Sequence, residues 1–242
     1  MLTVRMTPNL AGVTISGDYD DLQRLYDALT EIIGDESEPG RPYEMPALSI
    51  LAICYELRHA WQGNRAVNFV ANGLNEAVSQ NLKTLGPRQN VYFTARIPLP
   101  EILFDVMALY DFIELYDGKP DIPALDRDIQ MVQLFQAEVM TAVCSVLEDA
   151  PAGRLLRLVY GQVPRFRQYY THYVEMLNNR YLRLNREKRL QQIVPTARRI
   201  SERGADYEHF AADLLATAAE LDCPVSELEP VSPPLELSDS EW

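Results

Sequence analysis

The spacing of apolar residues along this chain changes once, near residue 120, and that change constrains the fold more than any other feature. Up to about residue 116, short runs with apolar side chains at every second position alternate with runs of helical period. After the segment DGKPDIP the strand signals stop, and the helical period continues to about Leu221. Because sheets and helices bury their apolar faces against one another, the chain is predicted to be α+β, with an all-helical C-terminal half.

The first half predicts a small sheet. Residues 3–6 and 13–16 alternate apolar and polar side chains on either side of TPNLAG, whose turn residues suit a β-hairpin. The stretches GNRAVNFVANG and QNVYFTARI indicate two more strands. Helices are expected over residues 19–33, 47–62 and 100–116. Strands in pairs, with helices between and after them, predict a largely antiparallel sheet with helices on one face.

The second half is predicted to contain helices and a tail. The longest helix is expected to begin at Pro164 and to reach about Val194, where Pro195 stops it. The other helices are expected over residues 126–147, 154–159 and 206–221. We therefore expect an α+β domain over 1–118, a helical domain or extension over 122–222, and an acidic, proline-rich mobile tail over 223–242.

Charge is unevenly distributed along the chain. The formal net charge is −13, yet residues 154–203 carry +9, between −5 on residues 121–153 and −10 on residues 204–242. This basic block also holds five tyrosines and one phenylalanine. Cations follow phosphates and aromatic rings stack on bases, so the block suggests a nucleic-acid interface. Its candidate contact residues, for nucleic acid or for an acidic partner, are Arg165, Arg167, Arg180, Arg183, Arg186 and Arg189.

A helical wheel favours a different role for the block. Most of its tyrosines fall on one apolar stripe with Leu177 and Leu184, which is the pattern of a core-facing helix. The arginines spread over the remaining surface instead of forming one ridge. The strongly acidic remainder of the chain also opposes the approach of a polyanion. We therefore favour solvated or intramolecular arginines, with the protein's own acids as their nearest partners.

No pattern in the chain specifies a reaction. Glu56 and His59 have the Glu-x-x-His spacing of carboxylate-bridged metal sites, but such sites need a second copy and further carboxylates. The only similar juxtaposition is His172 with Glu175, in reversed order. The chain has no phosphate loop, no GxSxG elbow, no HExxH and no CxxC pair among its three cysteines. We expect no catalytic residue, no metal and no cofactor, and a non-enzymatic protein over an enzyme.

The last residues resemble a short interaction motif. SELEPVSPPLELSDSEW interleaves apolar residues with acids and prolines, and it cannot bury enough apolar surface by itself. A solubilising tail without a specific target is the alternative interpretation. Trp242 is the candidate anchor, because aromatic side chains dominate interface energetics.

Three stretches of the first half resemble a small uncharacterised bacterial family, a domain of unknown function. They are NLAGVTISGDYDDLQRLYDALTEIIG, LAICYELRHAWQGNRAVNFVANG and NVYFTARIPLPEILFDVMALYDFIELY. The resemblance covers roughly residues 1–117 and extends to none of the helical half. It implies a bacterial, cytoplasmic protein and carries no activity or functional residue with it.

Three functions are compatible with these observations. The first is a non-enzymatic interaction or regulatory protein that binds another macromolecule, foremost a protein or a second copy, through the helical half and the acidic tail. The second is a nucleic-acid-associated protein that uses the basic helix, and the third is a metal- or carboxylate-dependent enzyme. The N-terminus has no apolar signal region and the longest apolar runs are about half of a membrane span. We therefore expect a cytoplasmic protein without a membrane partner.

Overall fold

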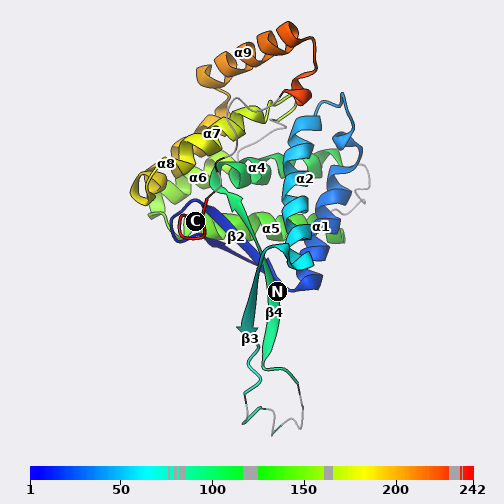
Figure 1. Ribbon diagram of the computed structural model, residues 1–242, viewed down its shortest axis with the longest axis vertical. Coiled ribbons are helices and arrows are strands. Elements are labelled where there is room, and N and C mark those ends of the chain that lie inside the picture. The colour runs from blue at the N-terminus through cyan, green and yellow to red at the C-terminus, as the bar shows by residue number, and fades with distance from the viewer. Residues whose placement is uncertain are drawn as a thin grey trace.

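The protein is a small sheet packed against a larger set of helices (Figure 1). The computed structural model describes residues 1–75, 77, 78, 81, 86–116, 125–160, 166–228, 235 and 237–242. The strands are β1 (Thr3–Met6), β2 (Gly12–Gly17), β3 (Ala66–Ala71) and β4 (Gln89–Pro98). They form one sheet in the order β1-β2-β4-β3, and every neighbouring pair is antiparallel. The predicted α+β class with a helical C-terminal half is confirmed.

The described part of the chain also contains eight α-helices. They are α1 (Tyr19–Ile33), α2 (Glu44–His59), α4 (Leu99–Leu115), α5 (Arg127–Cys144), α6 (Asp149–Tyr160), α7 (His172–Leu182), α8 (Arg186–Glu202) and α9 (Ala205–Leu221). Short helical segments are η1 (Gly34–Ser37), η2 (Ala60–Asn64) and η4 (Val225–Glu227). Asp18 and Asp21 form a capping box at the start of α1, in which each side chain accepts a hydrogen bond from the other residue's backbone N–H.

The two faces of the sheet differ in polarity. Val4, Ile15 and Ala95 lie opposite one another across β1, β2 and β4, and all three are buried. Arg5, Thr14 and Arg96 form the neighbouring row, which points to the other face because side chains alternate along a strand. Helices α1, α2, α4 and α5 contact the strands, so they cover the apolar face.

Helix α4 occupies the centre of the molecule. Thirteen of its seventeen residues are buried, including the acids Asp105 and Asp111. It contacts α2, α5, α7, α8 and the sheet. These neighbours cover most of its circumference, whereas a surface helix exposes one whole face. The apolar stripe expected from its sequence is therefore only part of its buried surface.

The single long helix expected over the basic block is wrong. Residues 166–171 are not helical, and helix α7 covers only His172–Leu182. The Asn185 side chain accepts a hydrogen bond from the Lys188 backbone N–H at 3.0 Å and starts a new helix, α8. Helix α8 then runs through Pro195 to Glu202. Asn185 breaks the segment, and the proline expected to stop it is accommodated within α8.

A membrane-spanning helix is not found among the residues that the structure describes, because none of these helices is both long and apolar enough.

Gly12 is required where β2 approaches β4. A Cβ atom at this position would collide with the backbone carbonyl of Ile97, and neither strand can move without breaking the ladder. We expect Gly12→Ala to lower the free energy of unfolding by about 2–4 kcal/mol, measured by urea denaturation. Gly153→Ala is the matched control, because its Cβ would meet only the tip of Arg157 at 4.0 Å. That control should be neutral or stabilising by up to about 1 kcal/mol, and equal losses in both variants would contradict the prediction.

Candidate functional site

The six candidate arginines do not form one exposed ridge. Arg165 lies outside the described residues. Arg167, Arg180 and Arg183 are exposed, and exposed Arg186 donates its Nε–H to the Pro8 carbonyl at 3.1 Å. Arg189 is only 5% exposed. The described members of the set therefore have different environments, and the burial of Arg189 differs from the surface position that the helical wheel gave it.

Arg189 connects three parts of the chain through carbonyl oxygens. Its Nη2 donates to Leu182 at 2.7 Å, and its Nη1 donates to Asn9 at 3.0 Å and to Glu241 at 3.2 Å. Burial lowers the pKa of this guanidinium from its usual value, while nearby Tyr181 and Glu241 oppose that shift. Arg189 thus joins the end of α7, the β1–β2 turn and the C-terminal segment.

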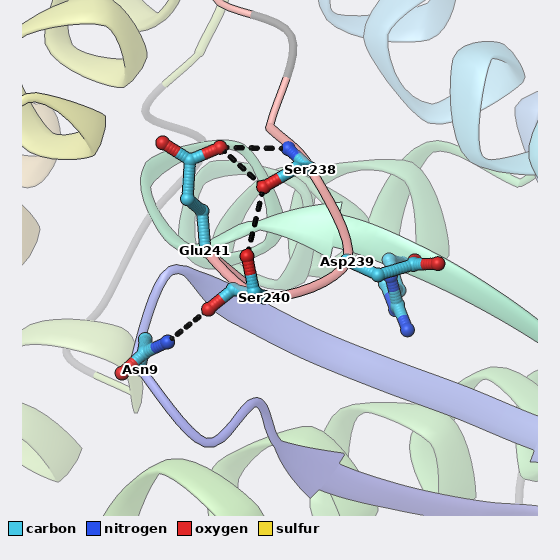
Figure 2. Close-up of polar contacts among 6 residues, drawn as sticks. Asn9, Ser238, Asp239, Ser240 and Glu241 are labelled. Carbon is cyan, nitrogen blue, oxygen red and sulfur yellow. Dashed lines mark hydrogen bonds and ion pairs between the residues drawn. The ribbon is translucent and has the colours of Figure 1, made fainter.

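The C-terminal residues form a turn held against the β1–β2 turn (Figure 2). The Asn9 backbone N–H donates to the Trp242 carbonyl at 3.0 Å, and its Nδ2 donates to the Ser240 carbonyl at 2.7 Å. Within the turn, the Glu241 Oε2 accepts from the Ser238 backbone N–H at 2.9 Å and from its hydroxyl at 2.6 Å. The described end of the tail is therefore tied to the chain mainly through backbone groups.

Trp242 lies against its own chain. It is partly buried against the core, and the Arg96 guanidinium stands 6.0 Å from the centre of its ring. Arg96 also pairs with Asp239 at 2.5 Å. Since Arg96 belongs to the polar face of the sheet, the C-terminal turn covers part of that face. The candidate tail anchor thus makes its contacts within the molecule.

Glu56 and His59 are engaged in structural contacts. Both Glu56 carboxylate oxygens accept from the Arg65 guanidinium, at 2.7 and 2.8 Å. His59 lies 4.2 Å from the Tyr55 ring, centre to centre, and its Nδ1 is 3.2 Å from the Asn64 Nδ2. Across the described ranges, no three His, Cys, Asp or Glu side chains are placed to share a metal ion.

A two-stranded ribbon projects from the sheet, formed by β3 and residues 89–93 of β4 (Figure 1). We call this element the ribbon. All six residues of β3 are exposed, and Phe69 is 66% exposed. Strand β2 pairs with β4 from Phe93 onward, so among the described strands residues 89–92 of β4 pair with β3 alone.

One face of the ribbon is apolar. Phe69 lies opposite Val91, and Val67 lies opposite Phe93. These four side chains share a face, because directly opposed residues of an antiparallel pair point the same way. By the same alternation, Val91 and Phe93 are in line with the buried Ala95 and Ile97. The ribbon therefore continues the core face of the sheet beyond the helices that cover it.

A second feature is a cavity of about 400 Å³ between α2, the start of α4, α7 and the C-terminal segment. We call it the acidic pocket. Its described polar lining consists of Ser49, Glu101, Thr171, His172, Glu175, Asn178, Asn179 and Ser226. Asn178 donates to the Glu101 Oε2 at 3.3 Å, and the His172 Nε2 is 2.9 Å from the Leu228 carbonyl. Among the lining residues that the structure describes, none is a lysine or arginine.

Two acids of α4 at this pocket have raised pKa values. Burial, and then the charges of Glu175 and Glu56, raise the pKa of Glu101 to about 7, while the Asn178 hydrogen bond opposes the shift. Burial and the Glu101 charge raise the pKa of fully buried Asp105 well above its usual range. Ser49 donates to the Asp105 Oδ1 at 2.7 Å and only partly offsets this. Sequence reasoning missed both acids, although two acids four residues apart in an apolar helix were a usable signal.

Arg189→Met should destabilise the protein and loosen the C-terminal turn. The substitution keeps the apolar stem but leaves three carbonyl groups without their charged donor. We expect a loss of about 2–4 kcal/mol in the free energy of unfolding, measured with urea. Arg183→Met, at an exposed position of the same segment, should change it by less than about 0.5 kcal/mol. Similar losses in the two variants would show that Arg189 has no special role.

Glu101→Gln should change how stability depends on pH. With a folded pKa of about 7 and an ordinary value of 4.5, the folded protein binds a proton that the unfolded chain has lost. The wild type therefore loses stability as the pH rises from about 4.5 through about 7. Glu101→Gln should remove about 1–3 kcal/mol of that loss, measured by urea unfolding at about pH 5 and pH 8. Exposed Glu220→Gln is the control, and parallel pH profiles for the wild type and Glu101→Gln would refute the prediction.

Comparison with known proteins gives one match. No curated protein and no solved structure matches the chain. A family model described as Domain of unknown function (DUF6904) matches residues 2–242. The match includes the helical half, so the extent of about 117 residues inferred from the sequence was too short. The chain belongs to this family of unknown function along nearly its whole length.

Proposed function

We propose that the protein is a non-enzymatic interaction protein whose binding element is the ribbon. The observation that carries this proposal is the apolar face on which Val67, Phe69 and Val91 are exposed, next to the partly buried Phe93. A two-stranded ribbon is marginally stable in water by itself, and apolar patches of this kind mark interaction sites. The binding surface differs from the one expected from the sequence, because the described end of the tail makes its contacts within the chain.

The partner that we propose for the ribbon is a second copy of the chain. A copy brings the same net charge of −13, which opposes association over most of the surface. The strands of the ribbon, AVNFVA and QNVYF, contain no charged residue. A two-fold axis would place one apolar face on the other, because such an interface is self-complementary. Burial of the two faces then supplies the hydrophobic free energy without bringing like charges together.

The remaining parts of the proposal concern the setting and the other surfaces. We place the protein in the bacterial cytoplasm, supported by the family resemblance of residues 1–117. Residues of the helical half that stay exposed, such as Arg180 and Arg183, are available for a further protein partner. The nucleic-acid alternative has less support, since Arg189 is buried and Arg186 donates a hydrogen bond to the Pro8 carbonyl.

Sedimentation velocity over a range of protein concentrations tests the proposed self-association. We expect the wild type to form a dimer, and Phe69→Ser to weaken its formation about tenfold or more, since a central aromatic is lost. Val91→Lys, which places a charge on the same face, should have the same effect. Leu221→Ser is the matched control, because Leu221 is 64% exposed and lies on α9.

Two results would overturn the proposed function. One is a wild type that stays monomeric at every concentration tested. The other is a dimer that both ribbon variants leave intact. Circular dichroism of each variant establishes that the fold is retained, and it should be, since these side chains are exposed.

A further inference from the structure

We propose that the acidic pocket binds a small aliphatic ammonium compound, with Glu101, Glu175 and His172 as its contacts. The inference is independent of the ribbon and of self-association. It rests on the cavity between α2, α4 and α7 and on the chemistry of the groups that line it. Ligand sites are typically cavities of this size, with apolar walls and a few convergent polar groups.

The unpartnered polar atoms at the pocket are acceptors. The Glu175 Oε2 is buried and has no hydrogen-bond partner among the described residues, and the same is true of the His172 Nδ1. The carbonyl of Leu228 can only accept, so the His172 Nε2 carries the hydrogen in their 2.9 Å contact. The Nδ1 of the neutral ring is then an acceptor. Buried acceptors without donors are costly, so a ligand that fits must bring N–H or O–H groups.

The charge of the pocket selects a cation. Glu101 and Glu175 line it, Asp105 lies behind Ser49, and Glu56 is near enough to raise the Glu101 pKa. Among the described lining residues, His172 is the only one with a basic side chain. An ammonium group would relieve the repulsion between the carboxylates and form charge-assisted hydrogen bonds with them. An anion would meet the opposite situation and is excluded by the same charges.

The remaining walls of the pocket are apolar, which favours an organic cation over a hydrated metal ion. Leu48 and Ala52 come from α2, Val174 and Leu182 from α7, and Leu228 and Leu235 from the C-terminal segment. A short hydrocarbon chain would contact these side chains while its ammonium group meets the acids. The donor set also lacks the geometry for a metal ion, since no three suitable side chains converge within the described residues.

Calorimetric titration with putrescine and with n-butylamine tests the inference on the full chain. We expect both amines to bind about tenfold more tightly than n-butanol, because a charged donor replaces a neutral one. Tetramethylammonium should bind more weakly than either amine, since it has the charge but no N–H group. Near pH 6 we expect binding to release protons, because a bound cation lowers the raised pKa of Glu101. Titrations in two buffers of different ionisation enthalpy measure that release.

Variants assign the binding to this pocket. Glu101→Gln and Glu175→Gln should each weaken amine binding about tenfold or more, and Glu101→Gln should also abolish the proton release. Glu220→Gln, at an exposed position on α9, should leave both unchanged. Ala52→Trp fills the pocket from its exposed wall without altering a carboxylate, and it should block binding in a folded protein.

The inference is refuted by any of four results. The first is the absence of amine binding to the wild type at millimolar concentrations. The second is equal affinity for the amines and n-butanol. The third is amine binding that survives both glutamine variants or Ala52→Trp. The fourth is displacement of bound putrescine by Mn²⁺ or Zn²⁺ at a concentration lower than that of putrescine, because the pocket would then be a metal site. None of these results bears on whether the ribbon mediates self-association.

Discussion

The burial of α4 on all sides is the constraint on which the rest of the structure depends. A helix with thirteen buried residues out of seventeen needs neighbours around its whole circumference, and these are the sheet and the helices α1, α2, α5, α6, α7 and α8. Its buried polar groups need partners too. The Asp111 Oδ2 accepts the Phe166 backbone N–H at 2.8 Å, and Gln136 donates to the Val106 carbonyl at 2.9 Å. Packing and polar contacts thus tie the helical half to α4.

Much of the fold could be predicted from periodicity, whereas the contacts between distant segments could not. The β1–β2 hairpin follows from alternation around TPNLAG, and α1 follows from its stripe and its Asp18 cap. The break at Asn185 was missed because no proline or glycine interrupts the segment between Pro164 and Pro195. The Asn185 side chain forms a local hydrogen bond that competes with continuation of the helix. A helical wheel shows only the directions of side chains and does not include such a bond. Pro195 shows the reverse error, since tertiary packing keeps α8 helical despite the lost hydrogen bond.

The charge pattern identified an unusual segment but not its partners. Arg189, the most buried of the described candidate arginines, binds three backbone carbonyls and no carboxylate. The acidic tail residue Asp239 pairs with Arg96 from the sheet and not with the basic block. Carbonyl oxygens carry no formal charge, so a count of charges along the sequence cannot reveal them. The sequence could therefore suggest partners within the chain for the arginines, but it could not identify the carbonyl groups that Arg189 binds.

The segment from Gln89 to Asp105 contributes to both proposed sites, and this follows from where its neighbours end. Strand β4 extends beyond β2 and the covering helices, so its first half keeps an apolar face in solvent. It continues directly into α4, whose first turn places Glu101 beside α7 and the C-terminal segment. There the helices leave a cavity. Hydrogen bonds to the nearby carboxylates of Glu101 and Asp105 offset only part of the cost of burying them. Both sites are therefore places where the burial that stabilises β4 and α4 is incomplete, and a second copy or an ammonium ligand would complete it.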